Sequence, residues 1–178
     1  AESKAFLNKG LNITVGRVGE KKEFRYPNGI QDYIEKIISK RPTLLDTPFY
    51  IEKDDNKMRL ETAFQWTTGT ETIFHSYANA IKTVDGGSHE TGFRNGITKA
   101  LRSYIERRKL LPKGINNITS DDVREGLIAI INIYLQGDVE FQGQTKGRLN
   151  SDITSQVESV VKHSLEHYLL ENQTMGDS

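Results

Sequence analysis

The sequence predicts an α+β domain in which helices cover one face of a sheet, in the element order β-β-β-α-β-α. Apolar and polar residues alternate in three segments between residues 49 and 79, which is the period of strands. Residues 89–108 and a stretch from about residue 152 repeat apolar residues at helical spacing. Residues 126–135 are almost continuously apolar, which indicates a central strand covered on both faces. We therefore expect a two-layer sandwich.

Alternation near the N-terminus predicts a separate hairpin. Leu11, Ile13 and Val15 alternate with polar or small residues, and Phe24 and Tyr26 alternate in a return strand. Two strands alone are marginal in water. We therefore expect residues 1–29 to be the last hairpin of a preceding domain, residues 30–172 to be the main domain, and residues 173–178 to be a tail.

A helix is predicted directly after this hairpin. Ile30, Ile34, Ile37 and Ile38 form one apolar stripe. The segment Lys40-Arg41-Pro42 closes the helix, with cations at its C-terminal end and a proline that stops it.

The three alternating segments that follow are predicted to form an antiparallel meander. They contain Phe49 to Ile51, Met58 to Trp66, and Ile73 to Asn79. Turn-forming residues separate them, at 54–56 and at 67–69. Because such short turns join antiparallel neighbours, we expect the three strands to pair in chain order.

Sequence signals for helix starts follow. Gly86 and Gly87 allow a sharp turn, after which Ser88, or alternatively Thr91, is the expected N-cap of a helix that runs roughly to Arg108. Thr119 or Ser120 is expected to cap a short turn, and Ser151 or Asp152 the last helix. These starts give the order of elements after the meander.

Composition excludes several classes of protein. The 178 residues carry 24 basic and 24 acidic side chains, so overall charge does not indicate a nucleic-acid binder. The chain has no cysteine, which excludes disulfides and thiolate metal sites. No apolar run approaches the roughly 20 residues of a membrane helix, and the N-terminus is not a signal peptide. We expect a soluble, cytoplasmic protein without a membrane partner.

The segment Gln144-Thr145-Lys146 is the first candidate site, because it lies on a loop between the apolar strand and the last helix. A lysine is a compact charge on a flexible stem, which suits contact with a phosphate. Taken alone, the three residues are a weak signal, because an ordinary solvated surface position is the usual place of a loop lysine.

Several segments, in this order along the chain, resemble the transducer domain in the B subunits of bacterial type IIA DNA topoisomerases, gyrase and topoisomerase IV. Gly86-Gly87-Ser88-His89 with Gly92-Phe93-Arg94 is similar to a glycine-rich turn of that family, in which threonine is usual in place of Ser88. Three further segments match: Ala5 to Leu11 resembles the last strands of the ATPase domain, Phe24 to Ile30 its junction with the transducer, and Asp121 to Leu127 the run that enters the buried strand. Asn28 stands where the family usually has a glycine.

The resemblance implies a ribosomal protein domain-2-like fold with a left-handed βαβ crossover, opposite to the usual handedness. It also implies that residues 1–29 end an ATPase domain of the GHKL class. The whole protein would be an ATP-hydrolysing topoisomerase, of which this chain is a catalytically incomplete fragment that relays ATP binding and hydrolysis to DNA strand passage.

The resemblance also assigns residues. Gln144 and Lys146 would contact the γ-phosphate of ATP in the neighbouring ATPase domain, and Lys146 would neutralise charge on the transferred phosphoryl group. Arg94 and Arg102 would line the cavity through which DNA passes, by phosphate contact without base readout. For Arg102 and the basic residues that follow it, a solvated helix face is the alternative.

Cofactors and partners follow from the same resemblance. ATP and Mg²⁺ are expected in the whole protein, and neither is expected on this fragment. The expected partners are duplex DNA, the A subunit in an A2B2 heterotetramer, and a second copy of the same subunit through the absent ATPase domain. The protein would act in the bacterial cytoplasm, at the nucleoid.

Three other functions are less well supported. A stand-alone nucleic-acid-binding module of the same fold is the main alternative, and the balanced charge argues against it. A small-molecule kinase would need a longer glycine-rich loop than Asp85 to Ser88. His163 and His167 are four residues apart on one helix face, but no further ligand accompanies them, so we expect no metal site.

Overall fold

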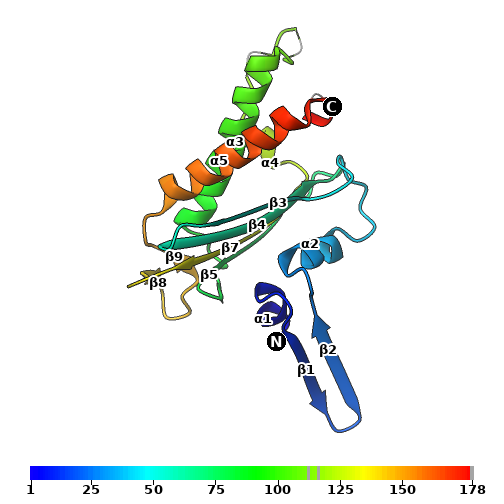
Figure 1. The fold of residues 1–178 in the computed structure, drawn as a ribbon, viewed down its shortest axis with the longest axis vertical. Helices are drawn as coiled ribbons and strands as arrows, with labels where there is room; N and C mark the ends of the chain where they lie inside the picture. The colour runs from blue at the N-terminus through cyan, green and yellow to red at the C-terminus, as the bar shows by residue number, and fades with distance from the viewer. Residues whose placement is uncertain (112, 116, 177–178) are drawn as a thin grey trace.

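The computed structural model describes residues 1–111, 113–115 and 117–176. A five-stranded sheet lies at its centre, with strand order β3-β4-β7-β5-β6 (Figure 1). Its strands are β3 (Phe49–Asp54), β4 (Met58–Trp66), β5 (Ile73–Ala78), β6 (Ile81–Lys82) and β7 (Leu127–Leu135).

The strand order differs from the predicted meander. β3 and β4 form the expected antiparallel pair, with Phe49 opposite Phe64. β5 does not pair with β4, because β7 lies between them, antiparallel to β4 and parallel to β5. The reason is burial: residues 127–133 are buried on both faces, so β7 takes the central position that its apolar sequence predicts.

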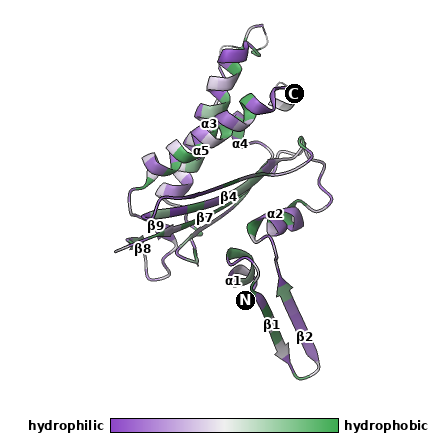
Figure 2. Cartoon of the chain, in the orientation of Figure 1, coloured by the Kyte–Doolittle hydropathy of each residue, from purple (hydrophilic) through white to green (hydrophobic). Residues whose placement is uncertain are grey.

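Two long helices cover one face of the sheet (Figure 1). They are α3 (Ser88–Arg108) and α5 (Thr154–Glu171). Polar and apolar residues alternate along both, as Figure 2 shows, and the apolar ones meet the sheet. The largest side chains in this core, which we call the helix-face core, include Leu60, Phe64, Phe93, Ile97 and Ile131.

The other face is also covered, which corrects the expectation of helices on one face only. α2 (Ile30–Ile38) and a short N-terminal helix, α1 (Glu2–Leu7), pack there. With Ala63, Tyr77 and Ile130 of the sheet they form a second apolar cluster, which we call the N-terminal core. Residues 5–7 were expected to resemble strands, but they are helical and fully buried, because their side chains anchor this core.

The predicted N-terminal hairpin is present as β1 (Asn12–Arg17) and β2 (Glu20–Arg25), with Ile13 opposite Phe24. It extends away from the central sheet (Figure 1), and most of its residues are exposed on both faces. Figure 2 shows that β1 carries apolar residues whereas β2 is mostly hydrophilic. The division into domains at residue 29 stays a prediction.

Helix starts agree only in part with the sequence. Thr119 caps α4 (Ser120–Arg124) through a capping box with Asp122, as predicted. Ser88 is instead the first residue of α3, and Gly87 occupies the N-cap without a side-chain bond. Likewise Ile153, not Ser151 or Asp152, stands at the N-cap of α5. The serine hydroxyls at 88 and 151 are engaged in tertiary contacts, which local capping rules do not include.

The remaining elements are short. They are β8 (Phe141–Gln142), β9 (Arg148–Leu149) and α6 (Gln173–Gly176). The end of the predicted tail, residues 177–178, lies outside the described residues. The parallel strands β5 and β7 are joined through α3 and α4, and the left hand of this crossover stays a prediction. None of the helices in the described ranges combines the length and apolar character that spanning a bilayer requires.

Candidate functional site

The Gln144-Thr145-Lys146 segment is the tip of a small hairpin that the sequence did not predict. β8 and β9 pair antiparallel and leave residues 143–147, the lysine loop, between them. A hydrogen bond from the Lys146 N–H to the Gly143 carbonyl oxygen, 3.1 Å long, closes the loop. Gln144, Thr145 and Lys146 are all exposed, so their side chains are accessible to another molecule or domain.

Lys146 combines an unusual backbone with an uncompensated charge. Its φ is +54°, in the left-handed region that residues other than glycine seldom adopt. Its Nζ lies 5.7 Å from the centroid of the Phe141 ring, and it forms no ion pair within the described part of the chain. Residues in this region of φ are enriched at functional sites, and Lys146 shares it with five other non-glycine residues among those described, Lys109 included.

The structure brings the lysine loop against the glycine turn, which we define as residues 85–88. The Asp85 N–H donates to the Gly147 carbonyl oxygen at 2.8 Å, and the Leu149 N–H donates to the Gly86 carbonyl oxygen at 3.1 Å. Arg148 adds a third bond, from Nη1 to the Asp85 carbonyl oxygen at 3.3 Å. The two segments that the sequence singled out are therefore one connected site.

Glycines make this approach possible. Gly87 has a φ of +148°, and a Cβ built there would lie 2.6 Å from the carbonyl oxygen of Leu149 and 2.8 Å from its nitrogen. A Cβ on Gly147 would overlap the Asp85 carboxylate. Gly86-Gly87 was recognisable as a turn from the sequence, but the partner of that turn and the contribution of Arg148 were not.

A buried polar network lies beneath the glycine turn. His89 is fully buried, and its Nε2 lies 3.0 Å from Thr83 Oγ1, which lies 2.8 Å from Ser76 Oγ. Burial lowers the pKa of His89 to about 4, because the charged imidazolium would lose its hydration. His89 is therefore neutral at physiological pH and contributes to the structure of the turn.

The two arginines predicted to face DNA both have local partners. Arg94 forms an ion pair with Glu90, and its guanidinium carbon lies 5.2 Å from the centroid of the Phe74 ring. The Nε of Arg102 donates to the Ile118 carbonyl oxygen at 2.7 Å. The Arg94 pair lies within α3, whereas the Arg102 bond joins α3 to the segment before α4. DNA contact by either arginine stays a prediction.

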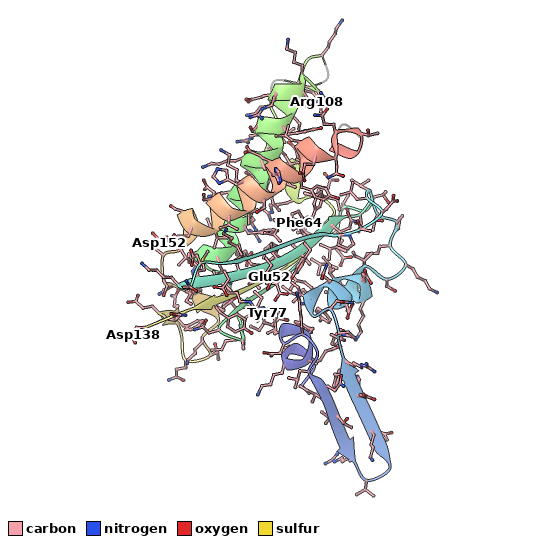
Figure 3. The ribbon with its side chains drawn as sticks, in the orientation of Figure 1. Glu52, Phe64, Tyr77, Arg108, Asp138 and Asp152 are labelled. Atoms are coloured by element: carbon pink, nitrogen blue, oxygen red, sulfur yellow. The ribbon has the colours of Figure 1, made fainter. Side chains whose placement is uncertain are left out.

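The lysine loop and the basic residues at the end of α3 lie apart, whereas Arg94 pairs with Glu90, whose carboxylate lies beside Gly86. Figure 3 places Asp138, just before β8, and Asp152, just before α5, at one end of the helical layer, and Arg108 at the other. The lysine loop therefore contacts the start of α3, while the basic residues after Arg102 lie toward its far end.

The histidines of α5 have partners of their own: His163 Nδ1 lies 3.4 Å from Ser159 Oγ, and His167 Nε2 lies 3.3 Å from Glu171 Oε1.

A second polar cluster, on the opposite face of the sheet, was not predicted. The Glu61 side chain is only 3% exposed, and Glu61 Oε1 accepts a hydrogen bond from the Tyr50 hydroxyl at 2.8 Å. Lys9 Nζ lies 2.6 Å from the same hydroxyl and 3.6 Å from Glu61 Oε1. A cavity of about 550 Å³ adjoins this cluster. The alternating pattern of β4 indicates the face of the sheet on which Glu61 lies. It carries no signal that Lys9 of the N-terminal segment is its partner.

Comparison with known proteins gives a consistent family. The family model described as DNA gyrase B matches residues 29–178. The DNA gyrase B protein of Enterococcus faecalis is 35% identical over 177 residues, which are 97% of this chain and 27% of the relative. The same protein of Halalkalibacterium halodurans is 37% identical over 172 residues, which are 94% of this chain and 27% of the relative. The chain thus spans about a quarter of the length of these relatives.

Solved structures match the fold. The 43K ATPase domain of Thermus thermophilus gyrase B, in complex with an aminocoumarin, has a TM-score of 0.85 at 27% identity, over 99% of this chain and 48% of that one. The ATP-binding domain of Francisella tularensis topoisomerase IV, with a small-molecule inhibitor, has a TM-score of 0.81 at 32% identity, with the same coverage. Because the family model covers most of the chain and the likeness extends over nearly all of it, this chain belongs to the DNA gyrase B family.

Proposed function

We propose that this chain is the transducer region of the B subunit in a type IIA DNA topoisomerase, and that its lysine loop contacts the γ-phosphate of ATP bound in a preceding domain. The observation that carries the proposal is the exposed Lys146, which has no ion-pair partner among the described residues and lies on a loop held at both ends. Membership of the DNA gyrase B family supports it, as does the likeness to two structures described as ATPase or ATP-binding domains.

The chemistry of the loop fits a phosphate. Lys146 supplies a positive charge where negative charge develops on the transferred phosphoryl group, and the Gln144 amide supplies a hydrogen-bond donor. Both are exposed side chains on one tight turn, so they can approach the same ligand. Loss of the γ-phosphate on hydrolysis would remove their shared partner and free the loop, which is the event that this region would relay.

The domain organisation belongs to the same proposal. We infer that residues 1–29 end a GHKL-class ATPase domain, that residues 30–172 form the transducer with a left-handed crossover, and that the rest is a tail. The exposed edges of β1 and β2 support this division, because a two-stranded ribbon gains stability by joining a larger sheet. ATP and Mg²⁺ then bind upstream, so this chain by itself is catalytically incomplete.

The partners of the whole protein complete the proposal. It is a DNA topoisomerase that pairs with an A subunit as A2B2, dimerises through its ATPase domains, and acts on duplex DNA in the bacterial cytoplasm. Arg94 and Arg102 contribute positive charge to the DNA cavity, and such phosphate contacts are sensitive to salt. Their local bonds leave the remaining guanidinium N–H groups as donors.

Hydrolysis of ATP by the whole topoisomerase protein tests the proposal. Lys146→Ala should lower turnover by about 100-fold or more, with nucleotide binding largely kept, because an electrostatic contact that strengthens in the transition state is lost. Lys40→Ala, at another exposed lysine, is the matched control and should leave turnover unchanged. Equal turnover in wild type and Lys146→Ala would contradict the proposal.

A further inference from the structure

We propose that the glycine turn is the device that positions Lys146, with Gly87 and Arg148 as positioning residues. The inference rests on the proposed function, in which Lys146 meets a phosphate. It adds that the place of Lys146 is set by residues 85–88, some sixty residues earlier in the chain, through backbone contacts.

The contacts flank the lysine closely. The residue after Lys146 accepts a hydrogen bond from the Asp85 N–H, and Gly87 and Leu149 form a parallel bridge two residues further on. The Arg148 side chain lies over the same turn, bonded to the Asp85 carbonyl oxygen. The C-terminal stem of the lysine loop is therefore joined to the start of α3 along three consecutive residues.

The same turn also fixes the chain after the loop. The Ser88 hydroxyl donates a hydrogen bond to the Ser151 carbonyl oxygen, and the Ile153 N–H lies 3.5 Å from the Ser88 oxygen. The Glu140 N–H, before the loop, donates to Ser151 Oγ at 2.8 Å. The chain before the loop is thus linked through Ser151 to Ser88, at the first residue of α3.

Gly87 is the residue on which this arrangement depends. A side chain there would meet the backbone of Leu149, and no rotation of a flexible side chain can relieve that overlap. The stem would have to separate from the turn and take the bond between the Leu149 N–H and the Gly86 carbonyl with it. A displacement of about 1 Å in a positioned catalytic group can reduce a rate by roughly 100-fold.

A double-mutant cycle in the whole topoisomerase protein tests the inference, with kcat and KM for ATP hydrolysis as the readout. Gly87→Ala should lower kcat by about 30-fold or more while KM for ATP changes less than about threefold. In a Lys146→Ala background, Gly87→Ala should lower kcat by a much smaller factor, because the charged group it positions is already absent and only the neutral Gln144 contact remains to be lost. Gly114→Ala is the matched control: Gly114 also has a positive φ, +93°, but nothing within 4 Å of its Cβ position, and its kcat should be unchanged.

Circular dichroism will show whether the Gly87→Ala variant folds. If it does not, Arg148→Ala is the second variant that tests the positioning role. The substitution removes one side-chain hydrogen bond from an exposed residue and should lower kcat by roughly three- to tenfold. In the Lys146→Ala background its effect should be much smaller.

Three outcomes separate the two proposals. A normal rate in Lys146→Ala alone overturns the proposed function and this inference with it. If Lys146→Ala lowers kcat strongly but Gly87→Ala and Arg148→Ala both leave it unchanged, only the positioning role of the glycine turn is overturned. Losses that multiply in the double variants also overturn it, because the turn would then act independently of the lysine.

Discussion

The two faces of the central sheet are built differently. The helix-face core is wide and almost wholly apolar, and α5 and the first part of α3 cover the sheet there, whereas the end of α3 projects beyond it. The N-terminal core is small and rests on two short helices, with Phe6 stacked on Tyr33 at 3.8 Å between ring centroids. Polar links border it, including Glu2, whose Oε1 accepts a hydrogen bond from the Tyr26 hydroxyl at 2.5 Å and one from Lys36 Nζ at 2.5 Å.

This difference indicates that the two faces stabilise different parts of the chain. On the helix face, apolar burial over a large area stabilises the sheet and its helices without contacts to another domain. The other face joins the sheet to α1 and to the projecting hairpin through a few aromatic and charged side chains. We therefore expect substitutions on the helix face to unfold the whole domain, and substitutions on the other face to release mainly the N-terminal segment.

The largest expected effect is that of Phe64→Ala on the helix face. Phe64 is fully buried and contacts the rings of Phe49, Trp66 and Phe93. Its truncation should lower the free energy of unfolding by about 4 kcal/mol, from lost burial and the cavity left behind. Denaturant unfolding should show one transition at a lower midpoint. A decrease in the free energy of unfolding below about 1 kcal/mol would contradict the expectation that the helix-face core stabilises the whole domain.

Phe6→Ala on the other face should cost about 3 kcal/mol, and locally. Phe6 is 1% exposed and packs against Tyr26, Tyr33 and Tyr77. Hydrogen exchange is the measurement that distinguishes the two faces. Amides of residues 5–7 should lose protection while those of β7 keep it, and equal loss in both would show that the faces are not separable.

Acid should weaken the helix face through His89. Burial lowers the pKa of His89 to about 4 in the folded chain, against a reference value of 6.5. The unfolded chain therefore binds more protons between these values, and stability present above pH 6.5 is lost as the pH falls toward 4, by up to about 3 kcal/mol. Unfolding measured at pH 7 and pH 4.5 should show this slope, and His89→Gln should flatten it in that window.

The smallest expected effect is that of Glu2→Gln in the N-terminal core. Hydrogen bonds from Lys36 and Tyr26 lower the pKa of Glu2 from its reference value of 4.5. Its stabilisation is therefore present above pH 4.5 and lost as the pH falls through the lowered pKa. Because a third of the side chain is exposed, the substitution should cost only about 1 kcal/mol at pH 7. A cost that persists at pH values below the lowered pKa would show that the carboxylate charge is not its source.

Local patterns predicted most of the elements. Alternation located β3, β4 and β5, and helical spacing located α2, α3 and α5, because side-chain period directly reflects which face is buried. α1 was missed, since six residues are too short to show a helical period. β8 and β9 were missed for the same reason, each having only two residues.

For the candidate site, the sequence identified Lys146 and the double glycine separately. Neither segment carries a signal for the other, because two of the three bonds between them join backbone groups that all residue types except proline possess. The predicted caps at Ser88 and Ser151 were wrong for a related reason: both hydroxyls bond to residues distant in the chain.

The sequence by itself determined the longer helices and strands, the place of residues 126–135 at the centre of the sheet, and the motifs that resemble the B subunits of type IIA topoisomerases. Only the tertiary structure decided that β7 separates β4 from β5, that both faces of the sheet are covered, and that the lysine loop is held at the start of α3. The physical reason is range. Periodicity and turn chemistry act over a few neighbouring residues, whereas strand order and loop anchoring depend on contacts between segments about sixty residues apart, which compete for the same apolar surface and the same backbone partners.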